Sequence, residues 1–431
     1  MDTNLSLADD ILGKIDALAE LSENENHLTR RSLTPEHRRA NDLVGSWMRN
    51  AGMQVHTDAA GNIIGRLEGL DSGTETTNQP AMLIGSHLDT VRNAGRYDGM
   101  LGVVLPVVCL QHLSDNEIRL PYPVEIVGFC DEEGVRFPST LIGSRAIAGT
   151  LKPDVLDERD AENISVAEAL QAFGASGSIE TAARASSQLL GFIECHIEQG
   201  PVLEQEDLPV GIVTAISGAS RFNITVKGKA GHAGTVPMSL RKDALAASCE
   251  CILEIEKLCA DLQDLVGTVG QINAMPGAGN VIPGEVEFSL DLRSSDDNNR
   301  AQATAQIEEA LQSIAKRRQV NIDIERTYHA DGVVCDSWLT GQLGNAIKNV
   351  GYRLHSMPSG AGHDAMAIAD ITRVAMLFVR CRDGVSHHPD ESITRDDALA
   401  AANVLISFLQ QFDATAGCSC IPCSSRSKRD M

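Results

Sequence analysis

Apolar and polar positions alternate along the first half of the chain as expected of an α/β domain. Apolar residues recur at helical spacing over residues 5–21. A second helix is predicted from Thr34 and Pro35 to Gly52, because a capping threonine followed by proline favours a helix start and glycine favours a helix end. Over residues 81–213, short apolar runs alternate with helical stretches, which predicts a parallel sheet covered by helices.

The pattern changes near residue 214. Six segments then follow in the order strand, helix, strand, strand, helix, strand, which matches a ferredoxin-like α+β module. They are predicted at residues 221–228, 241–260, 267–274, 284–292, 298–317 and 320–326.

A helix, a strand and a helix resume after this module, so we interpret the module as an insertion. The predicted catalytic domain is residues 1–213 and 331–412, and the predicted inserted domain is residues 214–330. Residues 413–431 have no periodicity and are predicted to be a disordered tail. The tail contains Cys418, Cys420 and Cys423, but three thiols without a fourth partner make a weak metal site.

Charge and composition narrow the possible partners. The chain of 431 residues carries a net charge of −23, which argues against nucleic acid and acidic membranes, since both require clustered Lys and Arg. No apolar run approaches the length of about 18 residues that a membrane helix requires. Eleven cysteines, an odd number, fit reduced thiols better than a disulfide framework. We therefore expect a cytoplasmic protein with neither nucleic-acid nor membrane partners.

Candidate chemistry gathers where predicted strands end. One apolar run, residues 81–85, is followed by His87, Asp89 and Asp98, and a second, residues 124–130, by Glu132 and Glu133. Imidazole and carboxylate ligands suit a divalent ion such as Zn²⁺ or Mn²⁺. A second glutamate beside a ligand glutamate is what metal-assisted hydrolysis needs, one to hold metal and one to move a proton. The pattern indicates a metallohydrolase.

Two further histidines follow predicted strands. His196 ends the apolar run 192–196, and His387 follows the run 374–379, next to His388. Each histidine alone could be a structural residue. Four strand ends that each carry a histidine or a carboxylate are hard to explain in that way, because strand ends of an open α/β sheet are where sites form.

Seven motifs in this order resemble the hydantoinase/carbamoylase branch of the dinuclear metallo-aminoacylase and carboxypeptidase superfamily, over residues 10–412. They are Gly85-Ser-His-Leu-Asp-Thr, Gly95-Arg-Tyr-Asp-Gly, Asp131-Glu-Glu-Gly-Val-Arg-Phe, His196-Ile-Glu-Gln-Gly-Pro, Gly231-His-Ala-Gly-Thr-Val-Pro-Met, Ser359-Gly-Ala-Gly-His-Asp-Ala and Val385-Ser-His. The resemblance implies an aminopeptidase-like α/β catalytic domain, an inserted ferredoxin-like dimerisation (lid) domain, and a homodimer.

The same resemblance implies two metal ions per subunit, Mn²⁺ or Zn²⁺. Asp98 would bridge them, Glu133 and His387 would complete one ion, and His87 and His196 the other. The position after His387 varies in the family, so His388 is expected to be a bystander.

Three other residues are expected to support the chemistry. Glu132 is the candidate general base, with a surface salt bridge as the alternative. Asp89 is expected to orient the His87 ring, since residues two apart on a strand face the same way. By the resemblance, His232 would stabilise the oxyanion from the partner subunit's inserted domain; a structural turn histidine is the alternative.

A small anionic ureide is the expected substrate. Arg293 can hold a carboxylate with two parallel hydrogen bonds, although by itself it is as compatible with a surface position. The resemblance assigns Arg293, Asn280 and Gln199 to substrate binding, and the loop residues Gly360 and Ala361 could approach the substrate closely.

The motif wording is most similar to that of family members that hydrolyse allantoate. The alternative is hydrolysis of N-carbamoyl-L-amino acids. A peptidase of the same superfamily is a further alternative, disfavoured by His196, where many peptidase relatives have a carboxylate. A non-catalytic metal-binding protein would require Glu132 to be dispensable.

Overall fold

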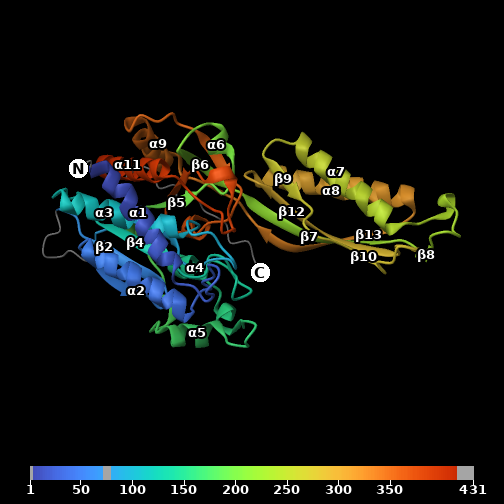
Figure 1. Cartoon of the computed structure of the whole chain (residues 1–431), viewed down its shortest axis with the longest axis horizontal. Helices are drawn as coiled ribbons and strands as arrows, with labels where there is room; N and C mark the ends of the chain where they lie inside the picture. The colour runs from blue at the N-terminus through green and yellow to red at the C-terminus, as the bar shows by residue number, and fades with distance from the viewer. Residues whose placement is uncertain (1–2, 71–78, 415–431) are drawn as a thin grey trace. The chain divides into compact units, whose positions relative to one another are not determined.

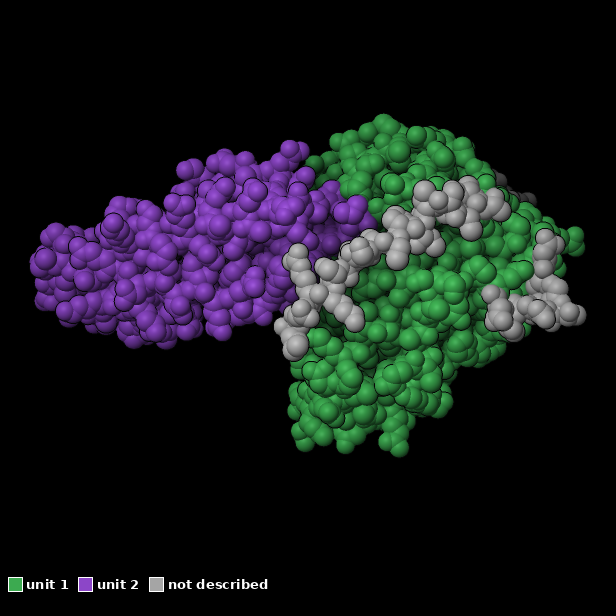
Figure 2. Space-filling model, turned by 180° about the vertical axis from the view of Figure 1, so that it is seen from behind, with its two compact units in different colours: residues 1–214, 335–357, 363–431 green, residues 215–334, 358–362 purple. Residues whose placement is uncertain are grey.

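The computed structural model describes residues 3–70 and 79–414 of the chain. It divides into two compact units, which Figure 2 colours separately. Unit 1 comprises residues 1–214, 335–357 and 363–431, and unit 2 comprises residues 215–334 and 358–362. The short segment 358–362 was not part of the predicted insertion. The predicted cysteine-containing tail falls almost entirely outside the described residues.

A mixed sheet with a parallel centre lies at the middle of unit 1. Its strands are β1 (Gln54–Thr57), β2 (Ile63–Leu67), β3 (Ala81–His87), β4 (Val124–Phe129), β5 (Leu189–Ile197), β6 (Val210–Ile216) and β16 (Val374–Val379). They lie in the order β1-β2-β4-β3-β5-β16-β6. Figure 1 labels β2, β4, β5 and β6 of this sheet. The four central strands β4, β3, β5 and β16 are parallel neighbours. The predicted parallel sheet is therefore confirmed for these central strands, whereas β6, also within the predicted region, is antiparallel to β16. The central strands are continuous apolar runs because both faces of the sheet are covered.

Helices cover this sheet. They are α1 (Thr3–Ala19), α2 (Pro35–Asn50), α3 (Met100–Asp115), α4 (Ile142–Ala148), α5 (Val166–Phe173), α6 (Val202–Gln205), α9 (Ser337–Asn349), α10 (Ala365–Ile368) and α11 (Arg395–Gln411). The predicted start of α2 is confirmed, since the Thr34 side chain accepts a hydrogen bond from the backbone N–H of His37. Short 3₁₀ turns lie at Pro153–Asp157, Ile179–Ala182, Ser186–Gln188, Met238–Leu240 and Arg382–Gly384.

One apolar core joins α1, α2, α3, α9 and α11 to a single face of the sheet. Met82 and Ile84 of β3 point into that core. Side chains alternate along a strand, so His87 points to the opposite face. The alternation thus keeps the histidine out of the main core and delivers it to the strand end.

Unit 2 is an α+β module with helices on a sheet. Its main elements are β7 (Gly218–Lys227), α7 (Ala244–Asp261), β9 (Leu265–Thr268), β10 (Ile272–Met275), β12 (Glu285–Ser294), α8 (Asp297–Arg318) and β13 (Asn321–Ala330). The antiparallel sheet has the order β10-β12-β7-β13, with β9 also paired to β12. The single strand predicted at 267–274 is two strands, because the backbone N–H of Gln271 donates to the Ser289 hydroxyl instead of continuing the ladder.

Four short strands complete the fold. β8 (Gly231–His232) and β11 (Val281–Ile282) form a separate antiparallel ribbon within unit 2. β14 (Val333–Val334) pairs with the end of β6. β15 (Ser356–Ser359) leads the chain from unit 1 into the segment 358–362.

Candidate metal centre

The carboxyl ends of the central strands bring the predicted metal ligands together. His87 ends β3, His196 lies near the end of β5, and His387 follows β16. Glu133 follows β4, and Asp98 lies just before α3. Three groups have ligand atoms within 4.8 Å of one another: His87, Asp98 and His196; Asp98, Glu133 and His387; and His87, Glu132 and Glu133. The first two groups match the two predicted ligand sets, and the third brings Glu132 to the same cluster.

Asp98 belongs to the first two groups and uses a different oxygen for each. Its Oδ1 lies 3.5 Å from Nε2 of His87 and 3.1 Å from Nε2 of His196. Its Oδ2 lies 3.1 Å from Nε2 of His387. A carboxylate whose two oxygens face different ligand sets has the geometry that a bridge between two ions requires.

Backbone contacts fix the tautomers of two histidines. Nδ1 of His87 lies 2.9 Å from the carbonyl oxygen of Asp89, and Nδ1 of His196 lies 2.9 Å from that of Ile197. A carbonyl only accepts, so each Nδ1 carries a proton. In the neutral ring Nε2 then has the lone pair that a metal ion needs, and in the protonated ring Nε2 donates to Asp98 instead. Such orientation of the second ring nitrogen is usual for metal-binding histidines.

Asp89 acts differently from the expectation. It orients His87 through its backbone carbonyl, whereas its carboxylate Oδ1 is 4.0 Å from Nδ1 of that ring. The carboxylate instead accepts the backbone N–H groups of Glu132 and Glu133, at 3.2 and 3.3 Å. Asp89 therefore supports the two glutamates as well as the histidine.

Gly99 provides the space that the His87 ring occupies. Its backbone φ of +70° lies in the left-handed region, which residues with a side chain rarely adopt. A Cβ atom at this position would collide with the His87 ring. The glycine that ends the Gly95–Gly99 motif is thus required both for the turn and for the ligand.

Crowding of acidic groups shifts their pKa values. Burial raises the pKa of Glu132 well above its ordinary value, although His87, with Nε2 at 4.0 Å from Oε2 of Glu132, acts in the opposite direction. Burial raises the pKa of Glu133 to about 7, and the charge of Asp98 adds to this effect. Burial also opposes ionisation of Asp98, but hydrogen bonds from His196 and His387 hold its pKa well below the ordinary value.

The residues present fit divalent cations. Oε1 of Glu133 and Oε1 of Gln199 are buried and lack a hydrogen-bond partner among the described residues. Unsatisfied buried oxygens are costly unless a cation or water is bound to them. The imidazoles and carboxylates of the three groups supply the nitrogen and oxygen donors that Zn²⁺ and Mn²⁺ accept.

Gln199 lies at this cluster. Its Nε2 donates to Oδ2 of Asp98 at 2.9 Å and to the Ser386 hydroxyl at 3.1 Å. His388 is exposed, with Nδ1 3.5 Å from a carboxylate oxygen of Asp390, and it stays outside the cluster.

Several residues around the cluster were missed by sequence reasoning. Glu391 is buried and accepts the backbone N–H groups of Tyr97 and Asp98. Glu194, also buried, accepts from the Ser86 hydroxyl at 2.8 Å. Glu194 lies two residues before His196 and Glu391 four residues after His387, so proximity to a ligand was the available signal.

Arg293 belongs to unit 2 and has a defined orientation there. Its Nε and Nη2 donate to the two carboxylate oxygens of Asp291, at 2.9 and 3.0 Å, and its Nη1 donates to the carbonyl of Gly360 at 2.8 Å. A guanidinium has five N–H groups. These contacts leave one N–H on each terminal nitrogen, the pair that a bidentate carboxylate takes.

His232 and Asn280 lie at the ribbon of unit 2. His232 is in β8, and the backbone N–H of the next residue donates to the carbonyl of Asn280. Nδ1 of His232 accepts the backbone N–H of Gly234 at 3.1 Å, so the neutral ring carries its proton on Nε2. The side chains of His232 and Asn280 are both exposed. Ala361 follows Gly360, whose carbonyl accepts a hydrogen bond from Arg293.

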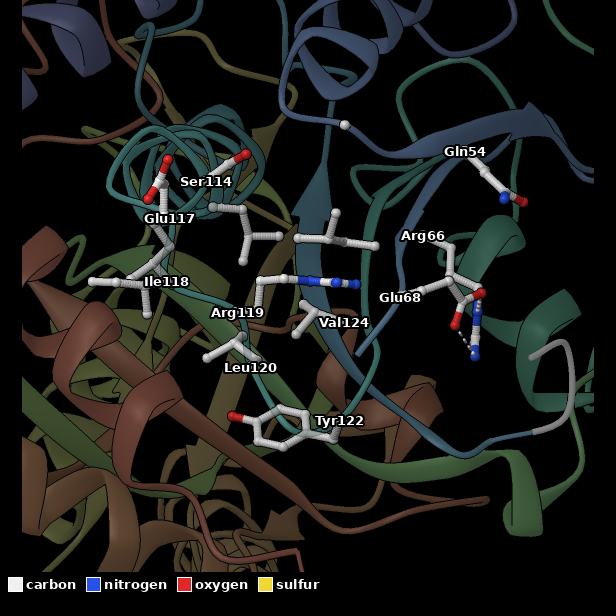
Figure 3. Close-up of a pocket in the computed structure, with 14 residues that line it drawn as sticks. Gln54, Arg66, Glu68, Ser114, Glu117, Ile118, Arg119, Leu120, Tyr122 and Val124 are labelled. Atoms are coloured by element: carbon white, nitrogen blue, oxygen red, sulfur yellow. Dashed lines mark hydrogen bonds and ion pairs between the residues drawn. The ribbon is translucent and has the colours of Figure 1, made fainter. Parts of the chain in front are cut away.

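A hollow of about 420 Å³ in unit 1 lies apart from this chemistry (Figure 3). It is lined by residues of β1, β2, α3 and the start of β4, none of which belongs to the metal cluster. Arg66 in its wall is paired with Glu68 and Glu125. The hollow therefore lacks the converging acid–base groups of a catalytic site.

Comparison with known proteins gives consistent matches. The peptidase family M20/M25/M40 matches residues 83–411. N-carbamoyl-L-amino acid amidohydrolase of Geobacillus stearothermophilus is 46% identical over 381 residues, covering 88% of this chain and 91% of that protein. Allantoate deiminase of Arabidopsis thaliana is 40% identical over 440 residues, which cover 94% of this chain and 82% of that protein. An amidase of the hydantoinase/carbamoylase family from Burkholderia multivorans superposes with a TM-score of 0.88 at 31% identity, covering 94% and 97%.

The fold of unit 1, the cluster around Asp98 and the similarity to these amidohydrolases together identify the protein as a hydrolase that acts on carbon–nitrogen bonds. The chain belongs to the M20/M25/M40 peptidase family, in its hydantoinase/carbamoylase group. This family depends on two metal ions, in agreement with the two ligand groups around Asp98. Within the described residues, no helix is both long and apolar enough to span a membrane.

Proposed function

We propose that this enzyme hydrolyses one ureido carbon–nitrogen bond of allantoate. Allantoate and water give ureidoglycine, ammonia and carbon dioxide. The observation that carries the proposal is the polar surrounding of Arg293, where Asp291 also pairs with the half-exposed Arg221. Allantoate presents one carboxylate and two polar ureido arms, so this polar surrounding suits it better than an apolar amino-acid side chain.

In the proposed reaction, each residue has one task. Arg293 holds the substrate carboxylate with its remaining pair of N–H groups, assisted by Asn280 and the loop of Gly360 and Ala361. Glu132, which lies in one ligand-atom group with His87 and Glu133, accepts the proton of the attacking water and returns it to the leaving nitrogen. His232 donates from Nε2 to the developing oxyanion.

Two divalent ions, Mn²⁺ in preference to Zn²⁺, would be held by His87, His196, Glu133 and His387 with Asp98 shared. When bound, they polarise the ureido group and acidify water. A cytoplasmic homodimer, with His232 supplied across the subunit interface, completes the proposal. Gln199 would contact the substrate once the ions engage Asp98.

Hydrolysis of N-carbamoyl-L-amino acids is the second candidate. The 46% identity to the Geobacillus stearothermophilus amidohydrolase favours it. These substrates share the carboxylate and one ureido group with allantoate, so the same residues would serve. The two candidates differ in what lies beside Arg293: a second polar arm or an amino-acid side chain.

Ammonia release separates the two candidates. The Mn²⁺-loaded protein is supplied with allantoate or with N-carbamoyl-L-methionine at matched concentrations, and kcat/KM is determined for each. We expect a higher value for allantoate. No turnover of allantoate, together with turnover of the carbamoyl amino acid, would establish the second candidate. A chelator-treated sample reports any metal-independent background.

A further inference from the structure

Glu391 connects the loop that carries His387 to the loop that carries Asp98, the residue that faces both proposed ligand sets. It lies four residues after His387, yet its Oε1 accepts the backbone N–H groups of Tyr97 and Asp98, at 2.8 and 3.0 Å. Its Oε2 lies 2.9 Å from the Ser386 hydroxyl. The side chain is 3% exposed, so these contacts are made away from water.

The fold makes room for this carboxylate. A Cβ atom on Gly95 would collide with the carboxyl group of Glu391. The loop before Asp98 therefore depends on a glycine for close approach, independently of the hydrogen bonds. Glu391 and Gly95 form a matched pair across nearly 300 residues of sequence.

Ser386 can serve only one acceptor at a time. Its hydroxyl oxygen lies 2.9 Å from Oε2 of Glu391 and 3.1 Å from Oδ2 of Asp98, and a hydroxyl has one proton to donate. With that proton directed to Glu391, Oδ2 of Asp98 keeps a lone pair for a cation. Glu391 thus affects Asp98 through the backbone and through Ser386.

His387 also depends on this loop. Its φ of +54° is uncommon for a residue with a side chain and persists only where surrounding contacts enforce it. The contact between Ser386 and Glu391 closes the turn around it. In contrast, His87 and His196 are oriented by carbonyl groups of Asp89 and Ile197, without Glu391.

We propose that Glu391 is a positioning residue that fixes Asp98 and His387 as ligands, and so sets the affinity of the ion they share with Glu133. This inference rests on the two-ion site of the proposed function. It predicts an asymmetry: loss of Glu391 should weaken one ion far more than the ion held by His87 and His196. Groups that support metal ligands typically contribute about 10- to 100-fold to metal affinity.

The test compares Mn²⁺ binding by wild type, Glu391→Gln and Asp390→Asn. The glutamine keeps the size of the side chain but presents an amide to Ser386. Asp390 is the matched control, since it is an exposed neighbour that faces His388. Chelator competition gives the affinity of each ion, electron paramagnetic resonance distinguishes paired from single Mn²⁺, and the Tm of the metal-free proteins reports folding.

We expect Glu391→Gln to bind one of the two ions about 10- to 100-fold more weakly, with single Mn²⁺ replacing the pair. Asp390→Asn should match wild type. Equal weakening of both ions, or of neither, would overturn the inference while leaving the proposed function intact. Wild type that binds fewer than two ions would instead contradict the proposed site. If Glu391→Gln does not fold, Gly95→Ala tests the same contact and should weaken the same ion.

Discussion

The proposed metal ligands of unit 1 differ in solvent exposure from the substrate-binding candidates of unit 2. Asp98, His87 and His196 are buried, and each is held by several contacts. His232 and Asn280 are exposed on a short ribbon. Contacts within the buried cluster fix the geometry of the first set and keep Asp98 ionised, whereas the exposed second set is free to adapt to a substrate.

This difference implies a division of labour. In the proposed reaction, residues of unit 1 should determine whether hydrolysis proceeds, because they would hold the ions and move the proton. Residues of unit 2 should determine which ureide is bound. Arg293 is intermediate in exposure: one-third of its side chain is exposed, yet Asp291 and Gly360 fix its orientation. Substitutions in the two units should therefore differ in which kinetic constant they change.

The largest effect is expected for Glu132→Gln. The amide cannot accept the proton of the attacking water, so kcat should fall by about 10²- to 10⁴-fold. Metal content and KM should stay near wild type, because Glu132 is not a predicted ligand. Glu133→Gln is the matched control and should instead lower the metal content. Full activity of Glu132→Gln would exclude its role as the base.

The next largest effect is expected for His232→Ala. Removal of an oxyanion donor typically lowers kcat by about 10²- to 10³-fold. If His232 acts across the dimer, co-expression of His232→Ala and Glu132→Gln subunits should restore part of the activity. Confirmed mixed dimers without any recovery would contradict a shared site. Dimers of His232→Ala alone give the baseline.

A smaller and substrate-dependent effect is expected for Arg293→Lys. Lysine keeps the charge but loses the planar pair of N–H groups. Charged hydrogen bonds contribute about 1.5–3 kcal/mol, so kcat/KM should fall by about 10- to 100-fold, mainly through KM. Arg326→Lys, an exposed change on β13 of the same sheet, is the control. An unchanged KM would remove Arg293 from substrate binding.

The sequence predicted those parts of the molecule that local patterns determine. β16 coincides with the predicted run 374–379, because a central parallel strand is apolar on both faces. The predicted strand-end residues likewise lie in one cluster, since His87 ends β3 and Glu133 follows β4. The break between β9 and β10 was missed because it depends on the Ser289 hydroxyl of a neighbouring strand.

Long-range contacts were beyond sequence reasoning for a similar reason. Glu391 reaches the backbone of Tyr97 and Asp98 only because the sheet places their loops together. The carbonyl of Asp89, rather than its carboxylate, contacts His87 because the chain turns after β3. Neither residue type nor spacing encodes which atom of a loop residue will face a ligand.

The last prediction concerns pH and the ligand of the cluster that is half-exposed, His387. In the metal-free protein, the hydrogen bond with Asp98 raises the pKa of His387 to about 9, against the effect of burial. Below that pH the ring is protonated and must lose its proton before it binds an ion. Burial raises the pKa of Glu133 to about 7, so a second proton is displaced below that pH.

Metal affinity should therefore rise with pH, by about tenfold per pH unit for each proton displaced, and level off above about pH 9. Chelator competition between about pH 6 and 9 measures the slope, and titration calorimetry in buffers of different ionisation enthalpy counts the protons released. His388→Gln, an exposed change next to the ligand, should leave the slope unaltered. A flat profile would show that His387 is already neutral in the metal-free cluster, so the contact with Asp98 would not hold a proton there.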